Sequence, residues 1–292
     1  MALDYTLLVV LAGISMVGLL AGVLGVFVLL RGQSLLGDAI SHAALPGIAL
    51  AFLITHSKSQ LILLVGGAFS GAIGMVLVTL VTTQTRLKKD AAQGMVLSIF
   101  FGLGLVLLTV IQKQPISNQS VLNKFLFGNV STLLYTELYA IAAVSVSVLF
   151  CIKLFWKELI AYSFDPLYVQ AIGFGQKTLT LLLSSMLLLA IVVGLQSVGV
   201  ILMSTMLIAP AAAARQWTSS ARAMALLSGF FGAFSGVVGV FFSSSIPGMP
   251  TGPMIVVVAS GIAFISLAGA SYGNRLYAWG RAKIRALRGK IS

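Results

Sequence analysis

The chain has 292 residues, of which 59% are hydrophobic and 8% are charged, and its mean hydropathy is +1.08. A soluble domain of this composition could not keep its apolar surface out of water, so the composition excludes that class and indicates an integral membrane protein. The formal net charge of +12 comes from basic residues spread over short connections between apolar runs, which is typical of contact with anionic lipid headgroups and not of nucleic-acid binding.

The first half of the chain contains four candidate membrane spans. Residues 5–30, 59–85 and 91–112 form runs of 26, 27 and 22 residues without Asp, Glu, Lys, Arg or His. Each exceeds the ~20 residues that a helix needs to cross a bilayer. A less regular span, at about 33–55, lies between the first two of these runs and carries Asp38 and His42.

The second half adds five spans, of which the first is predicted at about 134–152. The charge-free run 178–214 has 37 residues, about 55 Å as one helix, so we expect it to fold back near residues 196–199. The run 224–274 is longer still, and three prolines within residues 246–253 interrupt its helical hydrogen bonding. The total is nine spans, or eight or ten if one segment is re-entrant.

The basic residues predict the orientation of these spans. With the N-terminus outside, nine successive spans place fifteen of the 18 lysines and arginines on one side of the membrane and three, Lys58, Lys113 and Lys124, on the other. Because Lys and Arg resist translocation, the side with fifteen is expected to be cytoplasmic. The sequence therefore predicts one multi-pass domain over residues 1–292 in the plasma membrane, with its C-terminus in the cytoplasm.

Asp38 and His42 are the clearest functional signal in the chain. An ionisable side chain in hydrocarbon costs about 2.5–3.5 kcal/mol even on lenient insertion scales, so such residues tend to face a pore, a partner or a bound ion. At positions i and i+4 of a helix, the carboxylate and the imidazole share one face. Two structural alternatives are open: Asp38 caps a helix that begins at Ala39, or His42 hydrogen-bonds a neighbouring carbonyl.

The pair suits a first-row divalent metal ion. Carboxylate and neutral imidazole ligands are acceptable to manganese, iron and zinc alike, and the lack of thiolate ligands disfavours copper(I). The single cysteine, Cys151, excludes an intramolecular disulfide and a multi-cysteine metal cluster. Asp38 and His42 are therefore predicted to bind a metal ion in transit.

Three Gly-x-x-x-Gly motifs begin at Gly18, Gly67 and Gly232. Small residues at this spacing let helix backbones approach closely, which is a usual route to tight packing in lipid. The motifs predict close helix contacts either within the chain or at a dimer seam, and the sequence leaves both open.

The segment 153–176 differs from the other connections because it is long, mixed in charge and rich in aromatic residues. It falls on the predicted cytoplasmic side. Such a loop is expected to place a short amphipathic helix along the membrane surface, where another protein can bind it. The alternative is an interfacial helix held at headgroup depth by Trp156 and Tyr162.

Four blocks of this sequence resemble the permease subunit of the manganese/zinc/iron ABC importers. They are residues 93–98, 157–165 and 206–214 and, most specifically, Arg31-Gly32-Gln33-Ser34-Leu35-Leu36-Gly37-Asp38-Ala39-Ile40-Ser41-His42-Ala43-Ala44-Leu45-Pro46-Gly47. The resemblance implies an all-helical fold similar to the cobalamin-type (type II) importers with fewer helices. It also implies a homodimeric channel, two cytoplasmic ATPase subunits and an extracellular metal-binding protein that delivers the ion.

The resemblance makes the 153–176 segment the expected coupling region that docks into the ATPase. The residues expected to make this contact are Glu158, Ala161, Phe164, Asp165 and Gly173. The chain contains no Gly-x-x-x-x-Gly-Lys-Ser/Thr phosphate loop, so ATP hydrolysis is expected on a partner chain and not on this one. The chain is therefore expected to be a transport subunit without enzymatic activity and without a permanently bound cofactor.

The sequence thus predicts a permease that imports a divalent transition metal, with a slight preference for manganese over zinc and iron. Two rival classes of transporter are open. A secondary carrier driven by a proton or sodium gradient would be expected to carry several intramembrane acids or two inverted halves, whereas Asp38 is the one clear intramembrane acid. An ABC permease for a metal chelate or cobalamin would have a wide apolar passage instead of ligands. A purely structural membrane subunit is the third alternative.

Overall fold

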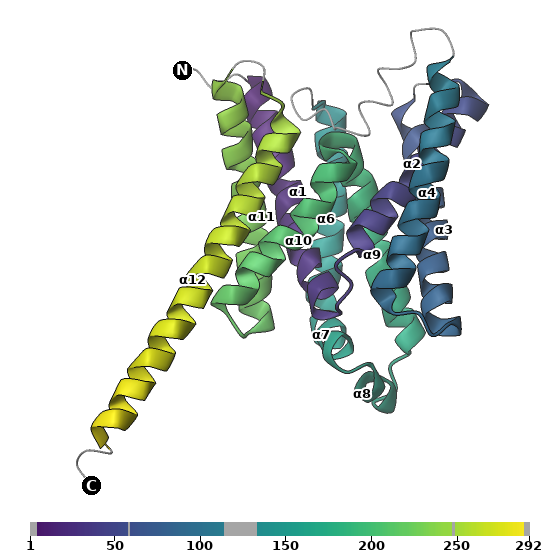
Figure 1. The fold of residues 1–292 in the computed structure, drawn as a ribbon. Coiled ribbons are helices and arrows are strands. Elements are labelled where there is room, and N and C mark those ends of the chain that lie inside the picture. The colour runs from purple at the N-terminus through teal and green to yellow at the C-terminus, as the bar shows by residue number, and fades with distance from the viewer. Residues whose placement is uncertain (1–4, 58, 114–132, 247–248, 289–292) are drawn as a thin grey trace.

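The computed structural model describes residues 5–57, 59–113, 133–246 and 249–288 (Figure 1). All the regular elements in these ranges are helices, and eight of them are long and apolar enough to cross a membrane. This confirms the predicted all-helical membrane class and falls within the predicted range of eight to ten spans. Lys58 and Lys124, two of the three basic residues predicted outside, lie beyond the described residues.

The eight long apolar helices are separated mostly by short connections. They are α1 (Tyr5–Leu30), α2 (Leu36–Thr55), α3 (Gln60–Gln84), α4 (Lys89–Gln112), α6 (Tyr135–Leu154), α9 (Gln176–Val198), α11 (Ala221–Ser245) and α12 (Thr251–Arg288). Two short helices, α7 (Trp156–Phe164) and α8 (Pro166–Ala171), form the connection between α6 and α9. The segment 153–176 is therefore helical in large part, but as two short helices instead of the single one expected.

Both breaks predicted inside the long apolar runs are present. The helix α9 ends at Val198 and α10 (Val200–Trp217) begins two residues later. Gly199 between them has a φ of 84°, which a residue without a Cβ adopts at no steric cost. The helix α10 has 18 residues, contains Pro210 and is largely buried. It is not one of the eight candidate membrane-spanning helices. The second break separates α11 from α12 at the proline-rich segment.

Close backbone contacts hold α1 in the centre of the bundle. A Cβ on Gly18 would collide with the backbone of Gly232 in α11, and a Cβ on Gly22 would collide with the backbone of Ser228. The Ser228 hydroxyl also donates a 2.6 Å hydrogen bond to the Gly22 carbonyl. The motifs at Gly18 and Gly232 therefore serve packing within the chain. The motif at Gly67 does so too, because that glycine packs on Ile48 of α2.

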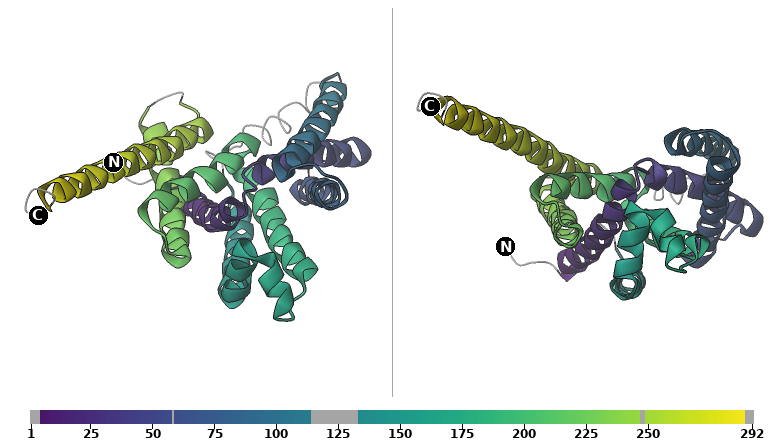
Figure 2. Two further views of the ribbon diagram at one scale, coloured as in Figure 1. Left: turned by 60° about the horizontal axis from the view of Figure 1, so that its bottom comes forward. Right: turned by 90° about the horizontal axis from the view of Figure 1, so that it is seen from below.

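The connections between helices gather at two ends of the bundle. The turns α1–α2, α3–α4 and α10–α11 lie at the same end as α7 and α8 (Figure 1). These turns contain or adjoin Arg31, Arg86, Lys88, Arg215 and Arg222, so the basic end of the bundle is the end predicted to be cytoplasmic. The helix α12 runs well past the rest of the bundle toward the same end, and it projects to one side when the bundle is viewed from below (Figures 1 and 2).

Candidate metal site and coupling segment

The helix α2 carries both predicted metal ligands. It begins at Leu36, with Leu35 at the N-cap, so Asp38 lies in the first helical turn. The alternative in which Asp38 caps a helix beginning at Ala39 is therefore wrong. The residues around the pair, including Gly37, Ala39 and Ser41, are buried, whereas Asp38 and His42 are half-buried. The two side chains thus share an open face of the stretch 36–49, which is otherwise buried.

Contacts with other helices place the start of α2 inside the bundle. The side chain of Leu207 in α10 fills the space beside Gly37, where a Cβ would lie 2.8 Å from the leucine Cδ1. The carbonyl of the same leucine packs against Gly25, five residues, or about 8 Å, before the end of α1 at Leu30. The first turn of α2 therefore lies deeper in the bundle than the basic end of α1.

The imidazole of His42 is held by an aromatic contact. Its ring meets Phe101 of α4 edge to face, with 4.8 Å between ring centroids and 73° between ring planes. Phe101 is the 13th of the 24 residues in α4, counting from Lys89. Because α4 is itself long enough to span the membrane, this contact places His42 near the middle of the apolar layer.

A ring nitrogen of His42 has no partner for a hydrogen bond. Its Nδ1 is buried and meets no donor or acceptor among the described residues. A buried polar atom in this state costs about 1–3 kcal/mol of stability. The hydrogen bond to a neighbouring carbonyl, which the sequence left open, is therefore not made by Nδ1. An imidazole with an unpartnered ring nitrogen, next to a carboxylate on the same face, is suited to binding a cation.

The described residues of one chain supply too few ligands to enclose such an ion. No cluster of three or more His, Cys, Asp or Glu side chains that could hold a metal occurs in the described part of the chain. Divalent manganese and zinc take four or more ligands. Water, backbone carbonyls or a second copy of the chain must therefore complete any coordination shell built on Asp38 and His42.

Sequence reasoning did not single out a second polar group near α2. Gln93 in the first half of α4 is fully buried, and neither atom of its amide group has a hydrogen-bond partner among the described residues. It shares a face of α4 with Gly104, three turns further on, which packs against Leu45 of α2. Because α4 is almost uniformly apolar, its sequence does not show which of its faces is buried. The polar side chain of Gln93 was the one available signal.

The coupling segment is anchored to the bundle by buried side chains. Leu159 of α7 is fully buried, and Tyr162 is 3% exposed. Trp156 packs edge to face against Phe27 of α1, with 5.8 Å between ring centroids. Trp156 and Tyr162 therefore fix α7 on the protein, and the alternative in which they hold an interfacial helix at headgroup depth is wrong for Tyr162.

The five expected coupling residues occupy different environments. Phe164 is 62% exposed at the end of α7, and Asp165 and Gly173 are also exposed. Ala161 is half-buried. Glu158 is half-buried as well, and its Oε2 is buried and has no hydrogen-bond partner within the described ranges. The structure therefore places Phe164, Asp165 and Gly173 on the surface at the basic end, where a cytoplasmic partner could reach them, and turns Ala161 and Glu158 partly inward.

Asp165 has a structural role in this segment. Its Oδ1 accepts hydrogen bonds from the backbone N–H groups of Leu167 and Tyr168, both at 3.0 Å, so it is the N-cap of α8. Pro166 follows at the first helical position, where proline is favoured. The Asp-Pro pair was a readable cap signal in the sequence. At the other end, Gly173 has a φ of 89° and lets the chain turn toward α9.

An exposed apolar patch surrounds Phe164. Its members lie on α7, on α8 and on the turn that follows, and they are Phe164, Leu167, Tyr168, Ile172 and Phe174, each 44–75% exposed. Exposed apolar clusters outside the lipid-facing surface mark sites of protein interaction. Sequence reasoning found Phe164 and missed the other four, because exposure along α8 depends on how the two short helices fold back.

Comparison with known proteins assigns the family. Residues 3–270 match the model of the ABC 3 transport family. The chain belongs to this family. It is 45% identical over 285 residues to the zinc transport system membrane protein TroC of Treponema pallidum, covering 97% of this chain and 96% of that one. It is also 44% identical over 251 residues to the manganese transport system membrane protein MntC of Bacillus subtilis, covering 86% of this chain and 58% of the relative.

Solved structures agree with the family. The structure of PsaBC from Streptococcus pneumoniae in complex with a Fab matches with a TM-score of 0.78 and 35% identity over 90% of this chain and 91% of that one. A transporter described as of the metal-chelate type, in an inward-facing conformation, shares the fold alone, with a TM-score of 0.71 at 14% identity. The predicted family and the ABC permease class are thereby confirmed, and membership disfavours the gradient-driven carrier.

Proposed function

We propose that this chain is the membrane-spanning subunit of an ABC importer for a divalent first-row metal ion, and that Asp38 and His42 bind the ion in transit. The observation that carries the proposal is the geometry of His42. This residue lies near the middle of the bundle, one helical turn from a carboxylate on the same face, and its buried Nδ1 has no partner in the part of the chain that the structure describes. Relatives named as zinc and manganese transport proteins support the class of cargo.

The shortage of ligands in one chain supports a dimer. A two-fold axis beside the open face of α2 would bring a second Asp38 and a second His42 to the same ion, giving four ligands. Manganese, zinc and iron all accept this set of donors. Selectivity among them then depends on the geometry of the shell and on the protein that delivers the ion, which we propose is an extracellular metal-binding protein.

The exposed patch around Phe164 supports docking of an ATPase. We assign it to the cytoplasmic side because the basic residues of the connections lie at the same end. The N-terminus is then outside, and ATP hydrolysis takes place on the partner. This chain binds the ion, holds it in the apolar layer and changes conformation when the partner moves α7 and α8.

Metal uptake by matched variants tests the proposal. The permease with its ATPase is reconstituted into vesicles, and uptake of free manganese or zinc is measured for Asp38→Asn and His42→Ala. Both variants are expected to lose uptake and retain normal yields of the complex. The controls are Asp90→Asn, in the first turn of α4, and His56→Ala, beyond the end of α2, and both should transport normally. Normal uptake by the Asp38 and His42 variants would refute the assignment.

The same vesicles distinguish the remaining alternatives. Uptake that requires ATP and the ATPase but no ion gradient supports the importer. Competition among free manganese, zinc and iron ranks the metals. If a metal chelate is transported and free ions do not compete with it, the cargo is a complex, and Asp38 and His42 have another role.

A further inference from the structure

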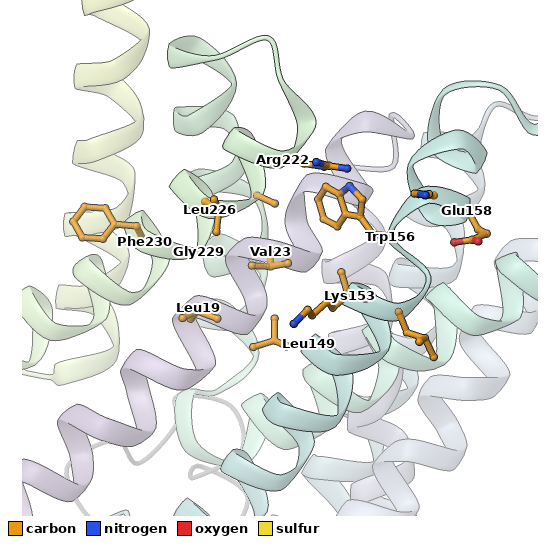
Figure 3. Close-up of a pocket in the computed structure, with 14 residues that line it drawn as sticks. Leu19, Val23, Leu149, Lys153, Trp156, Glu158, Arg222, Leu226, Gly229 and Phe230 are labelled. Atoms are coloured by element: carbon orange, nitrogen blue, oxygen red, sulfur yellow. The ribbon is translucent and has the colours of Figure 1, made fainter.

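A cavity of about 840 Å³ lies at the basic end of the bundle, and the described residues that line it come from helices other than α2. Its walls come from α1, α6, α7 and α11 (Figure 3). The apolar part is lined by Leu19 and Val23 of α1, Leu149 of α6, and Leu226 and Phe230 of α11. Leu226 and Phe230 are 76% and 60% exposed, so the cavity continues onto the outer surface of α11, where a membrane would cover it.

The other part of the cavity is basic. Lys153 in the last turn of α6, Lys157 of α7 and Arg222 in the first turn of α11 all line it. In Figure 3 the guanidinium of Arg222 lies beside the indole of Trp156, and the ammonium of Lys153 points into the apolar part near Leu149. The one acidic residue in the lining, Glu158, lies on the far side of Trp156 from Arg222. Three cations thus face one carboxylate.

The helix ends strengthen this charge. Both α7 and α11 begin at the cavity, and neither has a side chain that caps its first turn. The first N–H groups of a helix and its dipole favour an anion in this position. A tryptophan beside them is typical of the depth at which lipid headgroups meet the apolar layer. The cavity therefore presents cationic groups at headgroup depth and an apolar groove directed into the membrane.

We propose that this cavity binds an anionic phospholipid of the inner leaflet. The phosphate group lies between Lys153 and Arg222, and one acyl chain follows the groove that runs over α1 between α6 and α11. Basic pockets between membrane helices at the cytoplasmic surface recognise such headgroups, and each nearby Lys or Arg contributes roughly 1 kcal/mol, or about fivefold in affinity. Because α7 forms one wall, a bound lipid also connects the coupling segment to α11. This binding site does not depend on the metal cargo.

Native mass spectrometry of the purified full-length chain tests the proposal. The probes are phosphatidylglycerol and phosphatidylcholine with the same acyl chains. The wild type is expected to retain phosphatidylglycerol in preference, and the double variant Lys153→Gln/Arg222→Gln to lose roughly fivefold in that preference for each charge removed. The control, Arg86→Gln/Lys88→Gln, removes two exposed charges from the α3–α4 connection at the same end and should retain the lipid.

Two further variants test whether the substitutions cause misfolding and whether another molecule occupies the cavity. The charge-preserving swap Lys153→Arg/Arg222→Lys should bind as the wild type does. Equal retention of both lipids by the wild type, or an equal loss in the Arg86/Lys88 control, would overturn the proposal. So would a second copy in the cavity, which Leu226→Cys in a Cys151→Ser background would reveal as a disulfide-linked dimer under mild oxidation. Lipid retention is measured without transport, so failure here leaves the proposed metal import untouched.

Discussion

Arg31 and Tyr162 connect the coupling segment to the helix that carries the metal ligands. The guanidinium Nη2 of Arg31 donates a 3.0 Å hydrogen bond to the Tyr162 hydroxyl, and the Arg31 Cζ lies 4.6 Å from the centroid of the same ring. Arg31 belongs to the short turn between α1 and α2, seven residues before Asp38. The Tyr162 hydroxyl also hydrogen-bonds the Thr180 hydroxyl of α9. We therefore expect a movement of α7 to reach the start of α2 and α9 through these contacts.

Removing one hydroxyl group tests this connection. Tyr162→Phe keeps the buried ring and loses both hydrogen bonds; a bond to a charged group is worth about 1.5–3 kcal/mol. We expect the ATPase to co-purify normally and the metal imported per ATP hydrolysed to fall several-fold. The measurement is the ratio of uptake to phosphate release in vesicles.

The matched control for Tyr162 is Tyr139→Phe, which removes a hydroxyl from a 73% exposed tyrosine of α6. It should leave the ratio unchanged. An unchanged ratio in Tyr162→Phe as well would mean that the contact does not transmit movement. Loss of the ATPase from the complex would mean that the contact only supports the shape of α7.

If the ATPase docks on the exposed apolar patch around Phe164, truncation of this one aromatic side chain should have a strong effect. Phe164→Ala removes a patch residue whose side chain is 62% exposed, and truncation of an aromatic anchor that is buried at an interface costs about 2 kcal/mol or more. The yield of ATPase in co-purification should fall accordingly. Phe69→Ala, a 70% exposed phenylalanine of α3, is the control and should not change the yield. If Phe164→Ala gave the same yield of ATPase as Phe69→Ala, the ATPase would have to dock at another surface.

Two substitutions at Asp165, the N-cap of α8, distinguish a role in shaping α8 from direct recognition of its charge by the ATPase. Asparagine caps a helix as well as aspartate does, whereas alanine at the cap costs about 1 kcal/mol. If Asp165 acts by shaping α8, Asp165→Asn should dock the ATPase normally and Asp165→Ala should dock it weakly. Binding constants for the two variants check this. Equal weakening in both would instead indicate that the ATPase recognises the negative charge.

The contact between α1 and α11 predicts a steric effect on stability. A Cβ on Gly232 would meet the backbone of Gly18, and overpacking of this kind costs about 1–3 kcal/mol. Gly232→Ala is expected to lower the thermal unfolding temperature in detergent. Gly261→Ala in α12, where a Cβ has no neighbour within 4 Å, should leave it unchanged or raise it slightly because alanine favours helix. A harmless Gly232→Ala would show that α1 and α11 can separate.

Local signals allowed much of this molecule to be predicted from its sequence. Hydropathy and helix length depend on neighbouring residues alone, so the membrane class and most helix boundaries could be read directly. The fold-back at Gly199 and the proline break before α12 were also local, because each reflects what one or two residue types do to a helix. Asp38 and His42 could be paired for the same reason, since i and i+4 share a face of any helix.

Contacts between distant segments could not be read in this way. Arg31 and Tyr162 are separated by 131 residues, and nothing in an apolar sequence fixes which helices meet. The edge contact of Phe101 with His42 and the basic end of the cavity between α6 and α11 likewise became visible in the folded chain. The sequence by itself determined which residues enter the membrane and which two of them could bind an ion, because these follow from local chemistry. Tertiary packing alone decided how deep that pair lies, which ring nitrogen is left unpartnered and how the coupling segment reaches it, because these depend on which helix faces meet.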